Sequence, residues 1–331
     1  MNKITFFQRK PRKINFSLEF IFDEVRKNID NRYECKLKKA KFYSNGFFKR
    51  ILIAVDFLGS QGDVNHVTGD INFSSILLKK RKTILTILDV GFMTTTSKFK
   101  REILKFFWIT LPVKRAFYVT TISNSAKNEI LQFTNCNPNK IRVIYVPIST
   151  TFKKVPKEFN TIEPIILQVG TKFNKNIDRL IEALKGLKCQ LNIVGNLSEA
   201  QIKKLHKNNI NFKNYVNLTN EEIVQKYIDC DILSFVSTYE GFGMPIVEAN
   251  ATGRVVITSN VLSMPEVAGN AAVLVDPYDI AAIRAAFDRV IIDKVFRRKL
   301  ILNGFENCKR FGIDQIATEY VTLYKKVIKN K

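Results

Sequence analysis

Two glutamates, Glu240 and Glu248, stand on either side of a turn that reads Gly241-Phe242-Gly243. Glycine tolerates positive φ and lets another group approach the backbone, so this turn can come close to a ligand. Glu240 precedes the turn and is expected to lie near a group that is transferred. Glu248 lies further along, where a carboxylate can accept two hydrogen bonds from a diol such as the 2′- and 3′-hydroxyls of ribose.

A helix is expected to begin at Met244, directly after this turn. Pro245 suits the first turn of a helix, because its missing N–H would have no intrahelical partner there. The amino end of a helix presents N–H groups and the positive end of a dipole, which together attract phosphate. Carboxylates that flank a phosphate seat suit a nucleotide-diphosphate sugar.

A second anion-binding element is expected in the loop of residues 170–176, between an apolar strand and a helical pattern. Gly170 ends the strand, and Lys172 and Lys175 supply positive charge. At the carboxyl end of a parallel strand these groups would point at a bound ligand. Their fixed charge would stabilise a departing diphosphate. The alternative is that both lysines are solvated loop charges.

The C-terminal half alternates short apolar runs with amphipathic stretches, which favours a parallel sheet covered on both faces. The expected strands are 164–170, 190–194, 231–235, 254–257 and 273–275, and the expected helices include 176–184, 278–292 and 294–309.

The N-terminal half repeats this pattern less regularly. Its expected strands are 4–7, 84–88, 118–122 and 141–146. A stretch rich in Pro, Lys and Thr at 147–156 is expected to link two domains. The predicted fold class is α/β, with two Rossmann-like domains whose parallel sheets face a central cleft. We expect an N-terminal domain over 1–155, a C-terminal domain over 156–312, and a C-terminal helix over 313–331 that packs back toward the N-terminal domain.

Three longer stretches resemble the retaining glycosyltransferases of family 4, which have the GT-B fold. They read ILQVGTKFNKNIDRLIEAL, STYEGFGMPIVEANATGRVVITSN and MPEVAGNAAVLVDPYD, and the second contains the E-x7-E motif of that family. The resemblance covers nearly the whole chain and is most specific over residues 165–280. It implies transfer with retention of anomeric configuration, by front-face attack and without a metal ion or other cofactor.

The resemblance also implies roles for single residues. Glu248 would hold the ribose, Glu240 would orient the transferred sugar, and Lys175 would bind the diphosphate. The family usually has an arginine beside that lysine; it is absent here, and Lys172 is the candidate substitute, without the bidentate fork of arginine. The other positions implied in donor binding are Gly170, Gly241, Phe242, Gly243 and Met244.

Two N-terminal residues are candidates for the catalytic end of the site. His66, in the stretch NHVTGD, matches a family histidine that lines the cleft, and a structural histidine with satisfied nitrogens is the alternative. The family often has His-Asp after the next strand. Here Leu88 replaces the histidine and Asp89 remains.

Two motifs of other enzyme classes are not expected to function here. Asp229-Cys230-Asp231 spells the D-x-D metal motif of unrelated glycosyltransferases, but it falls where a helix ends and a buried strand begins. We therefore expect structural acids and no metal. The Gly241–Gly243 turn lacks the third glycine and the distant acid of a dinucleotide fingerprint, so NAD is not expected.

The composition is that of a globular protein, with a net charge of +23. Five scattered cysteines without a CxxC pattern suggest reduced thiols and a cytoplasmic location. No apolar run is long enough to span a bilayer, and the first residues do not resemble a signal peptide.

The positive charge is concentrated in residues 1–150, which carry 27 Lys and Arg against 11 Asp and Glu. This excess suggests an anionic partner, and a composition biased toward lysine is the alternative. A nucleic acid is not expected, because no nucleic-acid-binding signature is present. Residues 98–108 and 47–50 mix cations with aromatics. They suit either the inner face of an anionic cytoplasmic membrane or packing on the protein's own sheet.

The preferred hypothesis is a hexosyltransferase that uses a nucleotide-diphosphate sugar and a glycan or lipid-linked acceptor in surface polysaccharide or lipopolysaccharide biosynthesis. Two alternatives remain open. One is a nucleotide-sugar 2-epimerase of the same fold, and the other is a degenerate relative that binds the nucleotide sugar without turnover.

Overall fold

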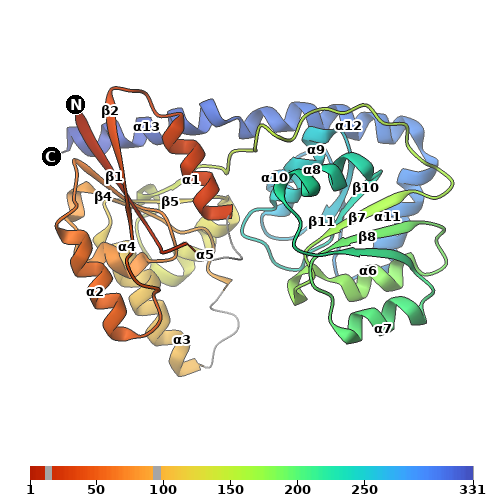
Figure 1. Cartoon of the computed structure of the whole chain (residues 1–331), viewed down its shortest axis with the longest axis horizontal. Coiled ribbons are helices and arrows are strands. Elements are labelled where there is room, and N and C mark those ends of the chain that lie inside the picture. Colours follow the sequence, from red (N-terminus) through yellow and green to blue (C-terminus); the bar gives the residue numbers. More distant parts are fainter. Residues whose placement is uncertain (12–16, 92–97, 331) are drawn as a thin grey trace. The chain divides into compact units, whose positions relative to one another are not determined.

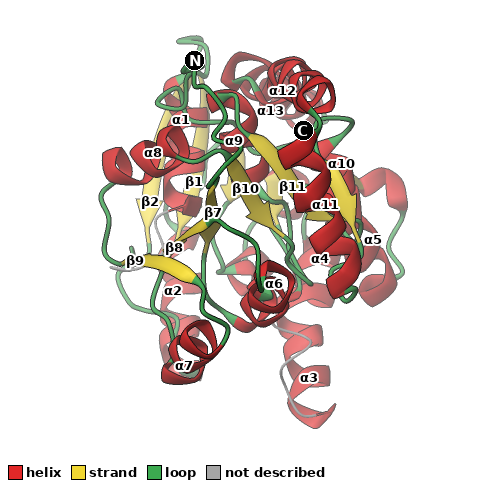
Figure 2. Cartoon of the chain, turned by 90° about the vertical axis from the view of Figure 1, so that its right-hand side faces the viewer, coloured by secondary structure: helices red, strands yellow, loops and turns green. Residues whose placement is uncertain are grey.

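The computed structural model describes residues 1–11, 17–91 and 98–330, which form two compact units (Figures 1 and 2). Unit 1 comprises Met1–Pro147 together with Gly312–Lys331, and unit 2 comprises Ile148–Phe311. The sequence also predicts a helix over 16–29 with Phe16 in its core, and residues 12–16 lie outside the described part of the chain.

Unit 1 is built on a six-stranded parallel sheet in the order β2-β1-β3-β4-β5-β6. Its strands are β1 (Asn2–Gln8), β2 (Tyr33–Lys39), β3 (Val64–Val67), β4 (Thr83–Thr86), β5 (Tyr118–Thr121) and β6 (Ile141–Val143). Its helices are α1 (Ser17–Lys27), α2 (Phe47–Leu58), α3 (Lys98–Leu104), α4 (Leu111–Arg115), α5 (Asn124–Thr134) and α13 (Ile313–Lys329). The sequence predicts a helix over 98–108, but a π-helical turn, Lys105–Thr110, joins α3 to α4, so this stretch is not one regular α-helix.

Alternation along the strands of unit 1 sends neighbouring side chains to opposite faces of the sheet. Phe7 pairs with Val67 and both contribute to a core that includes residues of α2, α4 and α5. Phe6 pairs with His66, whose ring contacts aromatic rings of α1 and α13. Figure 1 shows α1 and α13 on one side of this sheet and α2 and α4 on the other.

Unit 2 has a second six-stranded parallel sheet, in the order β12-β11-β10-β7-β8-β9. Its strands are β7 (Ile165–Val169), β8 (Gln190–Val194), β9 (Asn211–Tyr215), β10 (Ile232–Phe235), β11 (Val255–Ser259) and β12 (Val273–Val275). Its helices are α6 (Ile177–Leu184), α7 (Glu199–Lys207), α8 (Asn220–Asp229), α9 (Met244–Thr252), α10 (Met264–Ala268), α11 (Ile280–Ile292) and α12 (Lys294–Cys308). The strand order reverses between β7 and β10, and ligands of open α/β sheets bind at such a point.

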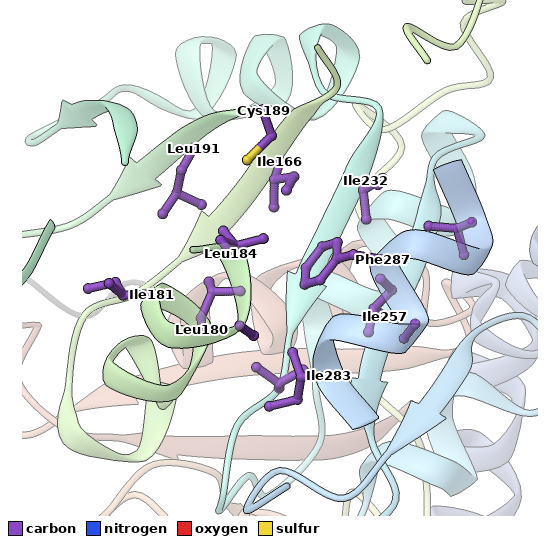
Figure 3. Close-up of a cluster of buried hydrophobic side chains, with 14 of the residues drawn as sticks. Ile166, Leu180, Ile181, Leu184, Cys189, Leu191, Ile232, Ile257, Ile283 and Phe287 are labelled. Carbon is purple, nitrogen blue, oxygen red and sulfur yellow. The ribbon is translucent and has the colours of Figure 1, made fainter. Parts of the chain in front are cut away.

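The core of unit 2 lies between its sheet and helices α6 and α11. Figure 3 shows Leu180, Leu184, Ile283 and Phe287 of these helices gathered with Ile166, Ile232 and Ile257 of the strands. Each such side chain stabilises the fold by roughly 1.5–3 kcal/mol when fully buried. Helices α8 and α9 cover the other face of the sheet (Figure 1). The core therefore fixes β7 and β10, whose carboxyl ends carry the candidate site.

The boundary between the two units falls after Pro147, whereas the sequence places it after residue 155. The intervening residues are held by unit 2 through hydrogen bonds to their backbone groups. The Ile148 N–H donates to the Phe311 carbonyl at 2.9 Å, and the Arg254 guanidinium donates to the Val155 carbonyl at 3.1 Å. The composition of a linker does not reveal such contacts.

None of the described helices combines the length and the apolar character needed to cross a membrane. The five cysteines are all free thiols.

Asp231 is a structural residue at the start of β10. Its buried carboxylate accepts hydrogen bonds from the backbone N–H groups of Ile165 at 2.8 Å and Asn160 at 3.2 Å, and it pairs with Lys157. The second acid of the D-x-D sequence is therefore occupied in holding β7 beside β10.

We predict that Asp231→Asn lowers the free energy of unfolding by about 1–3 kcal/mol, because the amide offers one acceptor oxygen instead of two and leaves a backbone N–H without its partner. Asp229→Asn is the matched control. Asp229 accepts a side-chain hydrogen bond only from the exposed Gln225 among the described residues, so its loss should change stability by less than about 0.5 kcal/mol. Chemical denaturation measures both, and equal effects of the two substitutions would contradict the assignment.

Candidate functional site

The candidate site lies where β7 and β10 end, at the point of strand-order reversal in unit 2. The loop after β7 and the loop after β10 are tied to each other by two asparagines. The Asn174 carbonyl accepts the Thr238 N–H at 2.8 Å, and the Asn176 side chain donates to the Val236 carbonyl at 3.0 Å. These bonds fix the relative position of the two loops that carry the predicted donor-binding residues.

Lys175 and Glu240 form an ion pair between these two loops. The Lys175 Nζ lies 2.6 Å from the Glu240 Oε1, and the two side chains are only 17% and 16% exposed. The same ammonium lies 4.5 Å from the centroid of the Phe235 ring. The lysine is therefore held at the strand ends by a carboxylate and an aromatic face, rather than extended as a solvated loop charge.

Gly170 makes room for this lysine. Its φ is +89°, and a Cβ built there would lie 2.8 Å from the Lys175 Cε. Any side chain at position 170 would both strain the backbone and displace the lysine. Glycine is therefore needed at position 170 because the Lys175 side chain passes close to its backbone.

The turn around Glu240 is fixed by side chains from outside it. Asn174 donates to the Tyr239 carbonyl at 2.9 Å and to the Glu240 carboxylate at 3.2 Å. The Ser263 hydroxyl lies within hydrogen-bond distance of the carbonyls of Glu240, at 2.9 Å, and Phe242, at 2.8 Å. No role was expected for Ser263 from the sequence. Its position just before the Met-Pro start of α10 was the available signal, since serine commonly precedes a helix.

Helix α9 begins directly after the turn, with Gly243 as its N-cap at φ +117° and with no side-chain cap. A Cβ at this glycine would lie 3.1 Å from the Ile246 side chain. Gly241 and Met244 are partly buried, whereas Phe242 is buried and packs edge-on against the Phe311 ring. The amino end of α9 therefore has no side-chain cap and follows Glu240 closely in the chain, and its role as an anion seat stays a prediction.

Glu248 lies on α9 and accepts a hydrogen bond from the Tyr227 hydroxyl to its Oε2 at 2.5 Å. Its other oxygen has no hydrogen-bond partner in the part of the chain that the structure describes. Part of the residue is exposed, but burial of the carboxyl group raises its pKa from 4.5 to about 7, against the opposing effects of Tyr227 and Lys175. One oxygen is therefore held and the other is available to a ligand. The sequence analysis missed Tyr227, whose partner lies one helix and one strand later in the chain.

Lys172 is a predicted donor-binding residue that does not take part in the Lys175–Glu240 pair. It is exposed and forms no ion pair with any described residue. The adjacent Phe173 is 94% exposed, so the tip of this loop carries a cation and an aromatic ring in solvent. The substitution of Lys172 for the missing arginine stays a prediction.

His66 is fully buried in unit 1. Its Nδ1 lies 2.8 Å from the Tyr324 hydroxyl of α13, and its Nε2 lies 2.8 Å from the Thr86 hydroxyl. Burial lowers the pKa of His66 from 6.5 to about 3, so the ring is neutral near pH 7. Because both nitrogens are occupied, the geometry favours the structural alternative over a catalytic role.

Asp89 is exposed and follows β4 in unit 1, where its carboxylate accepts the Gly91 N–H at 2.9 Å. It belongs to unit 1, whereas Lys175 and Glu240 belong to unit 2. Its role at the sugar end stays a prediction. Within residues 1–11, 17–91 and 98–330, no three His, Cys, Asp or Glu side chains are grouped so as to hold a metal ion.

Glu248 makes stability depend on pH in a direction that can be tested. The folded chain holds the Glu248 proton more tightly than the unfolded chain, so this residue's contribution to stability falls as pH rises from about 4.5 to about 7. We predict that Glu248→Gln raises the free energy of unfolding near pH 8 by about 1–3 kcal/mol and changes it much less near pH 4.5.

The matched control is Glu158→Gln, at an exposed position of the same unit, which should change stability little at either pH. Denaturation at both pH values measures the effect. A Glu248→Gln protein that is no more stable than the parent near pH 8 would contradict the burial of this charge.

The similarity to a known protein family is concentrated in unit 2. Residues 149–307 match the family model of the glycosyl transferases group 1, and this stretch lies within unit 2. The serotype-specific mannosyltransferase WbdA of Escherichia coli is 24% identical over 225 residues, which make up 60% of this chain and 27% of WbdA. The chain thus spans about a quarter of that relative's length.

Two further proteins are similar over more of their own length. The O-antigen chain mannosyltransferase RfbU of Salmonella typhimurium is 26% identical over 220 residues, or 63% of this chain and 61% of RfbU. The crystal structure of Anabaena HepE in complex with UDP and glucose has a TM-score of 0.79 at 12% identity, over 98% of this chain and 100% of that chain. The chain has the GT-B fold, and its unit 2 is similar to the group 1 glycosyl transferases.

Proposed function

We propose that this chain is a retaining, metal-independent glycosyltransferase, which moves a hexose from a nucleotide-diphosphate sugar to a glycan or lipid-linked acceptor. The observation that carries the proposal is the Lys175–Glu240 pair at the strand ends before α9, with Glu248 further along that helix. WbdA and RfbU are named as mannosyltransferases, and RfbU as an O-antigen chain enzyme, which supports a role in surface polysaccharide or lipopolysaccharide synthesis.

The Lys175–Glu240 pair suits a site in which Lys175 changes its partner from a carboxylate to a phosphate. Without donor, Lys175 is neutralised by Glu240 at 2.6 Å. A diphosphate at the amino end of α9 would attract Lys175, because phosphate carries more negative charge than a carboxylate. Glu240 would then be released to orient the hydroxyls of the transferred sugar. The ion pair keeps both groups in place and keeps the site electrically balanced before the donor arrives.

The transfer step breaks the bond between sugar C1 and the diphosphate oxygen and forms a bond from C1 to an acceptor hydroxyl oxygen. The acceptor proton passes to the departing diphosphate, and attack from the same face retains the configuration at C1. Charge on the leaving group is stabilised by Lys175 and by the dipole of α9. Glu248 accepts hydrogen bonds from the ribose through the oxygen that Tyr227 leaves available.

The acceptor end belongs to unit 1 in this proposal, and Asp89 is its candidate polar residue. The excess of cations in residues 1–150 supports a chain that works in the cytoplasm, peripherally on the inner face of an anionic membrane. A lipid-linked acceptor would be presented at that surface.

Donor binding is tested by thermal shift against uridine-, guanosine- and adenosine-diphosphate hexoses, with mannose and glucose represented. One member should raise Tm, since a ligand that binds only the folded state stabilises it. Lys175→Ala should lower the affinity for that ligand by about tenfold or more, because a charge-assisted hydrogen bond contributes about 1.5–3 kcal/mol.

The control is Lys188→Ala, an exposed lysine just before β8, at the amino ends of the strands, which should leave affinity unchanged. If no member binds, or if both variants bind alike, the proposal is wrong. With the ligand found, transfer to an acceptor should persist in EDTA and give a retained anomer by NMR. An epimer formed from donor alone would indicate the epimerase, and binding without turnover would indicate the degenerate relative.

A further inference from the structure

Helix α2 is apolar on both of its sides, although only one side faces the core. Ile53, Ala54 and Phe57 are buried against the sheet of unit 1. On the other side, Phe48 is 80% exposed and Phe47 is 67% exposed. The remaining exposed apolar residues of the helix are Ile51, Leu52, Val55 and Leu58. An apolar helix surface that does not face the protein's own core commonly marks a contact with a partner or a membrane.

The exposed residues form one continuous surface. Successive helix positions rotate by about 100°, which places these six residues on one arc opposite the buried side. We call them the α2 face. The chain that leads into the helix adds exposed Phe42 and Tyr43, and the Lys10 ammonium lies 4.9 Å from the Tyr43 ring centroid.

A second segment lies beside α2. The Arg50 guanidinium lies 4.4 Å from the ring centroid of Trp108, in the π-helical turn after α3. Two exposed phenylalanines, Phe106 and Phe107, precede that tryptophan. Arg50 thus joins α2 to another segment that exposes aromatic side chains.

The segment that contains the α2 face carries an excess of positive charge. Between Glu34 and Asp56 the chain contains six Lys and Arg residues and no acid. Asp56 is the only acid of α2, and it is neutralised by Lys38 at 2.9 Å and Lys41 at 3.2 Å. Lys49, beside the two exposed phenylalanines, is exposed as well. An apolar surface with a cationic margin matches the chemistry of an anionic bilayer surface, where apolar side chains enter the headgroup boundary and cations meet lipid phosphates.

We infer that the α2 face docks on an anionic lipid bilayer. A second copy of this chain is disfavoured as the occupant, because each copy carries a net charge of +23 and the margin of the face is itself cationic. The inference deepens the membrane part of the proposed function by naming the surface that makes contact. Docking through α2 would hold unit 1 at the plane in which lipid-linked acceptors lie.

Co-sedimentation of the full chain with vesicles tests the inference. We expect binding to phosphatidylcholine vesicles that contain phosphatidylglycerol, weak binding to phosphatidylcholine alone, and loss of binding at high salt. The double variant Phe47→Ser/Phe48→Ser should reduce partitioning by about tenfold or more, because two large apolar side chains no longer enter the bilayer. Lys49→Glu should reduce it by at least about fivefold, and most on the anionic vesicles.

The matched control is Ile292→Ser/Val295→Ser, which removes two apolar side chains of unit 2 that are each 81% exposed. It should bind vesicles as the parent does. Equal binding by the α2 variant and the parent, or no binding of the parent to anionic vesicles, would overturn the inference. If the parent sediments as a dimer and the α2 variant as a monomer, the α2 face binds a second copy of this chain instead. Donor affinity, measured by calorimetry on the same variants, should be unchanged, so a failure of the donor proposal is separable from a failure of membrane docking.

Discussion

The ion pair between Lys175 and Glu240 is the interaction on which the rest of this site depends. It joins the loop after β7 to the loop after β10, and these two strands are neighbours only because the strand order reverses between them. Gly170 permits the lysine to pass close to the backbone, and Asn174 holds both the turn and the carboxylate. The core between the sheet and helices α6 and α11 holds the carboxyl ends of β7 and β10 beside each other.

Burial of Glu248 makes its ionised carboxylate unfavourable for folding. Burial of its carboxyl group raises its pKa to about 7, which works against folding at neutral and higher pH. Tyr227 offsets part of that cost through its hydrogen bond, and it leaves one carboxylate oxygen unbonded to described residues. In the proposed function this second oxygen would accept hydrogen bonds from the ribose of the nucleotide.

The sequence predicts the parts of this fold that are apolar and regular. Strands β7, β8 and β10 and helix α6 follow directly from apolar runs and helical spacing. Edge strands β2 and β9 were missed, because their sequences, YECKLKK and NFKNY, are rich in polar residues that face solvent.

The order of strands, and with it the meeting of Lys175 with Glu240, depends on contacts between residues far apart in the chain. His66 illustrates the same limit: its partner Tyr324 lies 258 residues away, so its structural role was not legible in the motif around it. Tyr227 and Ser263 have roles that only their spatial neighbours reveal.

The central claim is that Lys175 exchanges a carboxylate partner for a diphosphate, and calorimetry of the free nucleoside diphosphate measures this most directly. Glu240→Gln removes the competing carboxylate without removing Lys175, so the account predicts tighter binding of the sugar-free nucleoside diphosphate than in the parent, together with slower sugar transfer. In Lys175→Ala the same Glu240→Gln substitution should no longer tighten binding. Unchanged or weaker nucleoside diphosphate binding in Glu240→Gln would contradict the account.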